Sequence, residues 1–138
     1  MGDAKLIEGL NRMLTQEYAC AIRYATHAAI ITGPYAQVVS ARLKEIAGDE
    51  ARHAKMLRDR IVALGGAPTM DVSADDLKPA TTLEDIIKVN MAEEHAAIRG
   101  YRDVLKRVPS DNVILLRTIE DIIRDEQEHL EELEALRP

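Results

Sequence analysis

The sequence contains no phenylalanine, no tryptophan and a single cysteine, Cys20. One cysteine excludes an internal disulfide and a metal site built from several cysteines. Four tyrosines are the only aromatic residues, so the interior has to be built mainly from Leu, Ile, Val, Ala and Met. Such side chains suit closely packed helices, and 138 residues are enough for one domain with a sizeable core.

Long apolar runs are also missing. No stretch approaches the roughly 20 apolar residues that a membrane-spanning helix needs, and the first residues do not have the layout of a signal peptide. The net charge of −6 argues against nucleic acid or an anionic membrane surface as the main partner. These absences predict a cytoplasmic protein that binds neither nucleic acid nor membrane.

Apolar residues recur at alternating spacings of three and four, which is the pattern of amphipathic helices. No strand-like alternation interrupts this pattern, so the sequence predicts an all-α protein. Glycine and proline divide the pattern into four predicted helices. They run from about Lys5 to Ile31, from about Tyr35 to Leu64, from Thr81 to about Val108, and from just after Pro109 to about Leu136.

The predicted helix ends carry recognisable capping signals. Thr81 and Glu84 have the spacing of a capping box at the start of the third helix. Pro109 ends that helix, and Ser110 or Asp111 can cap the fourth.

The connections between the predicted helices constrain their directions. Short turns at 33–34 and 109–110 make the helices on either side antiparallel. The linker at 65–81 could reach roughly 55 Å when extended. A helix of about 27 residues is only about 40 Å long. The sequence therefore predicts a four-helix bundle with one long crossover between the second and third helices. An up-down-up-down bundle with a loose linker remains the alternative.

Each predicted helix carries a glutamate in the middle of its apolar stripe: Glu17, Glu50, Glu94 and Glu126. Each of the four lies 15 or 16 residues from the neighbouring short turn. This separation corresponds to roughly 24 Å along a helix, so the four carboxylates should meet at one height.

Four carboxylates in one core need counter-charges. Burying even one unpaired carboxylate costs several kcal/mol, and like charges add repulsion. Protonation would remove some of the charge, whereas two divalent cations would balance all four negative charges. This balance favours a site for two metal ions.

Two histidines complete the pattern, because His53 and His129 each follow a core glutamate by three positions. Glu-x-x-His on two helices, with one Glu on each of the others, is the ligand arrangement of dimetal carboxylate bundles. Oxygen ligands with one nitrogen per ion suit Fe(II) or Mn(II), although Zn(II) would also bind. Glu93 competes with Glu94, but it is rotated about 100° away from the apolar stripe.

With these residues in place, the sequence resembles the ferritin-like superfamily and, within it, bacterioferritin. The resemblance covers nearly all four helices and includes the seven-residue spacing from Glu17 to Tyr24. It implies a single ferritin-like di-iron domain over residues 1–138. It also implies the ligand roles: Glu17 and His53 as terminal ligands of one iron, Glu94 and His129 as terminal ligands of the other, and Glu50 and Glu126 as bridges.

The resemblance implies a ferroxidase-type oxidoreductase of iron homeostasis and detoxification, which oxidises Fe(II) to Fe(III) with O2 or peroxide. Manganese or zinc would be substitutes for iron. Tyr24 would hydrogen-bond a ligand or donate an electron, and a plain core tyrosine is the alternative. A dimetal peroxidase or catalase-like enzyme and a non-catalytic metal-binding bundle are the competing functions.

Two departures from bacterioferritin modify these expectations. Bacterioferritin places a haem-ligating methionine directly after the bridging glutamate of the second helix, where this chain has Ala51. That substitution argues against haem. The family's cages use a fifth helix, whereas this sequence stops at Pro138. We therefore expect a homo-oligomer, by default a dimer formed through the first two helices.

Overall fold

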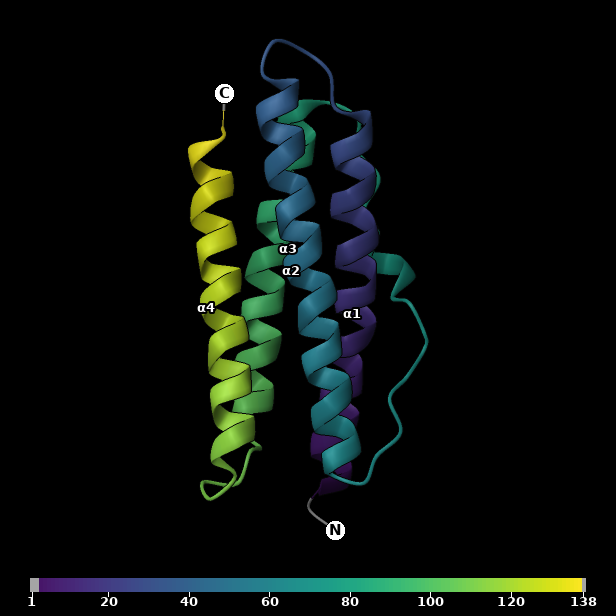
Figure 1. Cartoon of the computed structure of the whole chain (residues 1–138), viewed down its shortest axis with the longest axis vertical. Helices are drawn as coiled ribbons and strands as arrows, with labels where there is room; N and C mark the ends of the chain where they lie inside the picture. The colour runs from purple at the N-terminus through teal and green to yellow at the C-terminus, as the bar shows by residue number, and fades with distance from the viewer. Residues whose placement is uncertain (1–2, 138) are drawn as a thin grey trace.

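The computed structural model describes residues 3–137, which form a bundle of four α-helices and one short 3-10 turn (Figure 1). The elements are α1 (Asp3–Ile30), α2 (Ala36–Ala63), η1 (Ala74–Asp76), α3 (Leu83–Leu105) and α4 (Val113–Ala135). No strand occurs in this range, so the predicted all-α class is confirmed. Within the same range, no helix is long and apolar enough to cross a membrane. Residues 1, 2 and 138 of the predicted domain lie outside the described residues.

The helices have the directions that the connection lengths predicted. α1 and α2 are antiparallel and are joined by a short turn, in which Gly33 adopts a φ of 113° that favours glycine. The linker after α2 runs back along the bundle, so α3 starts beside the α1–α2 turn and runs parallel to α2 (Figure 1). α4 then returns antiparallel to α3. The long crossover is confirmed, and the up-down-up-down alternative is wrong.

Side chains of α1 fix the first half of the crossover against the bundle. The amide of Asn11 donates to the carbonyl of Ala67 (3.1 Å) and accepts from the backbone N–H of Thr69 (2.9 Å). The Tyr18 hydroxyl donates to the Thr69 carbonyl at 3.0 Å. These bonds satisfy backbone groups of a segment that has little secondary structure of its own.

A buried polar network fixes the second half. Arg23 of α1 is only 1% exposed, and its Nε donates to Oδ1 of Asn90 on α3 at 2.7 Å. A second guanidinium nitrogen donates to the backbone carbonyl of Asp76 in the crossover. His27 lies 3.0 Å from the Asn90 amide and 3.1 Å from the carbonyl of Lys78. The network therefore joins α1, α3 and the crossover.

The start of α3 lies one residue later than predicted. Thr82, and not Thr81, is the N-cap, and its hydroxyl accepts from the backbone N–H of Asp85 at 3.1 Å. Glu84 is accordingly in the first turn instead of closing a capping box. Ile86, in the first turn after this cap, is fully buried in the core.

The turn between α3 and α4 is longer than predicted. α3 ends at Leu105 and not near Val108, because the N–H groups of Arg107 and Val108 donate to carbonyls three residues earlier, in a tighter turn than the α-helix. The backbone N–H of Asn112 donates to the carbonyl of Pro109, so residues 109–112 form a turn. Asn112 caps α4 by accepting from the N–H of Leu115 at 3.2 Å. The predicted caps, Ser110 and Asp111, lie within this turn.

The apolar core consists of two clusters separated along the bundle axis. One cluster lies towards the start of α1 and includes Leu10, Leu57, Tyr101 and Ile119. The other lies towards the end of α1 and includes Tyr24, Leu43, Ile86 and Leu133. Between these clusters lies a layer of buried charged side chains.

Candidate metal centre

The six predicted metal ligands form that buried layer. α1 and α3 contribute one glutamate each, and α2 and α4 each contribute a glutamate and a histidine one turn later. None of the six is more than 1% exposed: Glu17, Glu50, His53, Glu94, Glu126 and His129. The structure therefore brings together every residue that the sequence analysis placed there.

The layer divides into two overlapping groups of potential metal ligands. In each group, four side chains offer ligand atoms that lie within 4.8 Å of one another: Glu17, Glu50, His53 and Glu126 in one, and Glu50, Glu94, Glu126 and His129 in the other. Glu50 and Glu126 belong to both groups. Two shared and two separate glutamates, with one histidine per group, are the division that the resemblance implies.

Each histidine directs its Nδ1 atom into the layer. Nδ1 of His53 lies 2.9 Å from Oε2 of Glu17, and Nδ1 of His129 lies 2.9 Å from Oε2 of Glu94. The same two nitrogens lie 3.3 and 3.4 Å from Oε1 of Glu126. The ring centroids are 6.3 Å apart. One imidazole nitrogen and one terminal carboxylate thus converge at each end of the layer.

The outer nitrogens of the histidines face two aspartates that sequence analysis missed. Nε2 of His53 lies 2.8 Å from Asp125 of α4, and Nε2 of His129 lies 2.8 Å from Asp49 of α2. Arg52 links the two aspartates by donating to both, at 2.9 and 2.8 Å. Carboxylates in this position fix the tautomer and orientation of metal-binding histidines.

Burial and mutual repulsion keep protons on most of the carboxylates of the metal-free layer. Burial raises the pKa of Glu17 to about 7, and the negative charge of Glu126 adds to the effect. Burial and the charge of Glu126 also raise the pKa values of Glu50 and Glu94 well above the usual range. Burial would raise the pKa of Glu126 too, but the two histidine rings whose Nδ1 atoms lie beside its Oε1 hold it below the usual value.

The surrounding carboxylates keep protons on the two histidines. Burial alone would lower the pKa of His129, but the neighbouring carboxylates of Glu126 and Glu94 raise it to about 12. The pKa of His53 is likewise raised by the surrounding carboxylates, against the effect of burial. Protons therefore balance the charge of the layer when no metal is bound.

The hydrogen bonding of the layer tests whether these residues fit metal ions. Among residues 3–137, six buried carboxylate oxygens have no hydrogen-bond partner: both of Glu50, both of Glu126, and Oε1 of Glu17 and Glu94. A buried polar atom without a partner costs about 1–3 kcal/mol, and more when it is charged. Divalent cations would satisfy these oxygens, so the residues fit a dimetal site.

Two tyrosine hydroxyls share this lack of partners. Within residues 3–137, the hydroxyls of Tyr24 and Tyr101 are buried, and they neither donate nor accept a hydrogen bond. Sequence analysis singled out Tyr24 and did not consider Tyr101. The sequence does contain a signal for Tyr101, because this residue follows Glu94 by seven positions, just as Tyr24 follows Glu17.

Glu93 lies outside the layer. Its carboxylate is 3.9 Å from the guanidinium of Arg23 and 4.0 Å from the ammonium of Lys78. Its neighbour Glu94 occupies the layer, as the apolar stripe predicted.

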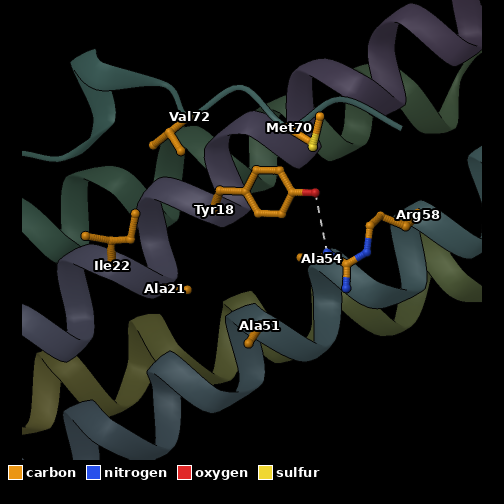
Figure 2. A pocket seen from close by; sticks show the side chains of 8 residues that line it. All are labelled: Tyr18, Ala21, Ile22, Ala51, Ala54, Arg58, Met70 and Val72. Atoms are coloured by element: carbon orange, nitrogen blue, oxygen red, sulfur yellow. Dashed lines mark hydrogen bonds between the residues drawn. The ribbon is translucent and has the colours of Figure 1, made fainter. Parts of the chain in front are cut away.

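The outer face of α1 and α2 carries an open groove of about 450 Å³ (Figure 2). Side chains of both helices and of the crossover line it: Tyr18, Ala21, Ile22, Ala51, Ala54, Arg58, Met70 and Val72. Ala51, the position at which the resemblance places a haem-ligating methionine, lies in this groove. Its methyl group offers no ligand atom to a haem iron.

Comparison with known proteins agrees with this geometry. A bacterioferritin from Desulfovibrio desulfuricans is 32% identical over 129 residues, which cover 92% of this chain and 71% of that protein. A ferritin-like, diiron-carboxylate protein from Bacillus anthracis superposes with a TM-score of 0.93 at 32% identity, covering 100% of this chain and 99% of that one. A bacterioferritin from Rhodobacter capsulatus, described with a metal-free dinuclear site and haem iron, gives 0.84 at 25% identity, covering 96% and 83%.

A family model points the same way. The model of the ferritin-like domain matches residues 7–137, a range that contains all four glutamates and both histidines of the layer. The bundle with its single crossover and the similarity to bacterioferritin lead to the same assignment. The chain therefore belongs to the ferritin-like domain family.

Proposed function

We propose that this protein binds two iron ions in the buried layer and oxidises Fe(II) to Fe(III) with O2 or peroxide. The observation that carries the proposal is the pair of ligand groups that share Glu50 and Glu126, with six carboxylate oxygens lacking partners. Relatives named bacterioferritin and diiron-carboxylate protein favour iron over manganese or zinc. Bound iron would supply the one-electron chemistry, and the chain would hold and orient it.

The ligand roles follow from the two groups. Glu17 and His53 would hold one ion, Glu94 and His129 the other, and the shared glutamates would bridge them. Each histidine would give up the proton on Nδ1 and keep the one on Nε2, where Asp125 or Asp49 accepts it. The outer aspartates thereby hold both rings in the orientation for binding.

We propose that Tyr24 donates a hydrogen bond to one of the metal ligands. Burial raises the pKa of its phenol, and the charges of Glu94 and Glu50 raise it further, so the hydroxyl keeps its proton. A protonated phenol is a hydrogen-bond donor, and the unpartnered oxygen of Glu94 is an acceptor in the same core. Tyr24 would stabilise the carboxylate in its metal-bound position.

We further propose that residues 1–138 form one ferritin-like domain in the cytoplasm and that it assembles as a homo-oligomer, by default a dimer. The support for assembly is the exposed apolar surface beside the groove in Figure 2. Ile22 is 48% exposed and Met70 is 92% exposed on this face. Pairing two such faces would remove these side chains from water.

Anaerobic titration of chelator-treated protein with Fe(II) tests the proposed function. We expect saturation at two equivalents per chain and a rise in melting temperature on binding. Admitting O2 should then convert the bound Fe(II) to Fe(III) faster than it converts free Fe(II). Wild-type protein that binds no iron would contradict the proposal, and binding of two ions without oxidation would leave a non-catalytic metal-binding bundle.

Glu50→Ala provides the site-specific variant. It removes a ligand that both groups share, so binding of both ions should be lost. Glu45→Ala is the matched control, because Glu45 lies on the same helix but is exposed and pairs with Arg42. Equal loss in the two variants would mean that the carboxylates of the layer are not the binding site. Faster turnover of peroxide with Mn(II) than of O2 with Fe(II) would identify the dimetal peroxidase alternative.

A further inference from the structure

Tyr24 and Tyr101 occupy equivalent positions on two antiparallel helices. Each follows the glutamate of its own helix by seven residues, or about 10 Å of helix. α1 and α3 run in opposite directions (Figure 1). The two tyrosines therefore lie on opposite sides of the layer. Tyr24 belongs to one apolar cluster and Tyr101 to the other. Each apolar half of the core therefore places one phenol next to the layer.

The direction of helical side chains brings both phenols towards the carboxylates. Side chains of long residues lean towards the N-terminus of their helix, which in each case is the direction of the layer. The hydroxyls of Tyr24 and Tyr101 are buried without a partner, and so is Oε1 of Glu17 and of Glu94. Two donors without acceptors thus share the core with acceptors that have no donor.

The apolar cluster around each phenol shows which glutamate it approaches. Tyr101 of α3 shares its cluster with Leu14 of α1, three residues before Glu17. Met91 of α3, three residues before Glu94, packs against the cluster that contains Tyr24 of α1. Each phenol therefore lies on the side of the layer from which it approaches the terminal glutamate of the other helix.

From this placement we infer that Tyr101 is a second positioning residue of the centre, equivalent to Tyr24, and that its hydroxyl donates to Glu17 when cations occupy the layer. The inference rests on the proposed metal binding. Each terminal glutamate would thus accept a hydrogen bond from the phenol of the other helix. Tyr101 of α3 would donate to Glu17 of α1, and Tyr24 of α1 would donate to Glu94 of α3. The bound carboxylates would then be fixed from both sides of the layer.

Titration with Zn(II), which undergoes no redox change, tests the inference without reference to turnover. Tyr101→Phe should weaken Zn(II) binding by about tenfold or more, the usual effect of losing a hydrogen bond to a metal ligand. Metal binding should also perturb the tyrosine absorption of the wild type. The chain has four tyrosines and no tryptophan. Tyr101→Phe should therefore lose the contribution of one phenol, and the double variant with Tyr24→Phe the contribution of both.

The stability of the metal-free protein distinguishes a positioning role of Tyr101 from a role in core packing. The Tyr101 hydroxyl has no partner, so Tyr101→Phe should leave the melting temperature of the metal-free protein unchanged or raise it. It should reduce only the increase on binding Zn(II). Tyr18→Phe is the control: its hydroxyl donates to Thr69, so the metal-free protein should lose stability while Zn(II) affinity stays the same.

The outcomes also separate this inference from the proposed function. Wild-type protein that fails to bind Zn(II) and Fe(II) would overturn both. Wild-type binding with unchanged affinity and unchanged tyrosine signal in Tyr101→Phe would overturn only the role of Tyr101. A lower melting temperature of metal-free Tyr101→Phe, without an effect on affinity, would show that the residue acts through packing alone.

Discussion

Both histidines of the layer contact carboxylates through both ring nitrogens. The inner nitrogens face Glu17 and Glu94, and the outer nitrogens face Asp125 and Asp49. Each aspartate belongs to the helix opposite its histidine, so α2 and α4 orient each other's imidazole. The outer carboxylates decide which nitrogen is free to bind a metal.

Asp125→Asn should weaken metal binding without removing a ligand. An amide can turn its NH2 group towards Nε2 of His53 and so favour the tautomer with the proton on the inner nitrogen. We expect a loss of about 10- to 100-fold in Zn(II) affinity, measured by competition with a chromogenic chelator. Asp121→Asn, exposed on the same helix, should bind like the wild type. Wild-type affinity in Asp125→Asn would rule out a positioning role for the outer aspartates.

The metal-free protein should become less stable as pH rises from about 5 to about 8. Burial raises the pKa of Glu17 from 4.5 to about 7, so the folded state holds a proton that the unfolded chain has released. This contribution is fully present below 4.5 and is lost as pH rises through about 7. The raised pKa of His129 acts in the same direction above 6.5.

Urea denaturation of chelator-treated protein across this range measures the effect. Glu17 alone should account for a decrease on the order of 3 kcal/mol in the free energy of unfolding. Glu17→Gln should flatten the dependence, because its amide does not titrate. Metal affinity should rise over the same range, because cations compete with the protons. Stability that increases with pH would show that the layer is not protonated in the folded state.

The residues of the layer could be predicted because they break a regular pattern. A glutamate on an apolar helical stripe is visible in the sequence, and similar distances from the turns align all four. Asp49 was missed because a helical wheel places it near His53 of its own helix, whereas it contacts His129. That contact depends on the distance between α2 and α4, which no single-helix pattern contains. Tyr101 was missed because its hydroxyl looks like part of an ordinary core side chain.

At the scale of the helices, connection lengths carried more information than the caps. The linker after α2 was long enough to cross the bundle, and it does. The cap of α3 was ambiguous, because Thr81 and Thr82 are each followed three positions later by an acidic residue. The sequence pattern is the same for both threonines, and only the structure shows that the hydroxyl of Thr82 is the one that accepts.

The choice of cap predicts unequal effects of two neighbouring substitutions. Thr82→Ala should lower the free energy of unfolding by about 1 kcal/mol, because the N–H of Asp85 loses its acceptor. Thr81→Ala, one residue earlier and exposed, should change it by less than about 0.5 kcal/mol. Thermal or urea denaturation of both variants measures the difference. A larger loss of stability in Thr81→Ala would show that Thr81 is the N-cap, as the capping-box spacing predicted.

At the scale of the whole molecule, the exposed apolar groups on the α1–α2 face predict self-association. Ile22→Lys would place a charge in the proposed contact and should convert the dimer into a monomer. Light scattering after size-exclusion chromatography measures the mass. The matched control is Ile114→Lys, because Ile114 is also exposed but lies at the start of α4. A monomeric wild type, or a dimer that persists in Ile22→Lys, would exclude this face as the contact.

The charged layer between the two apolar clusters also bears on how the chain selects one alignment of its helices. Sliding one helix by a single turn would move its glutamate about 5.4 Å, out of reach of the opposing histidines and into leucine and isoleucine. The displaced carboxyl group would be buried in an apolar cluster away from the histidines, at a cost of about 1–3 kcal/mol when protonated and more when charged. Apolar cores tolerate many alignments, because leucine packs against leucine in any of them. The layer therefore penalises misaligned bundles during folding, before any metal ion arrives.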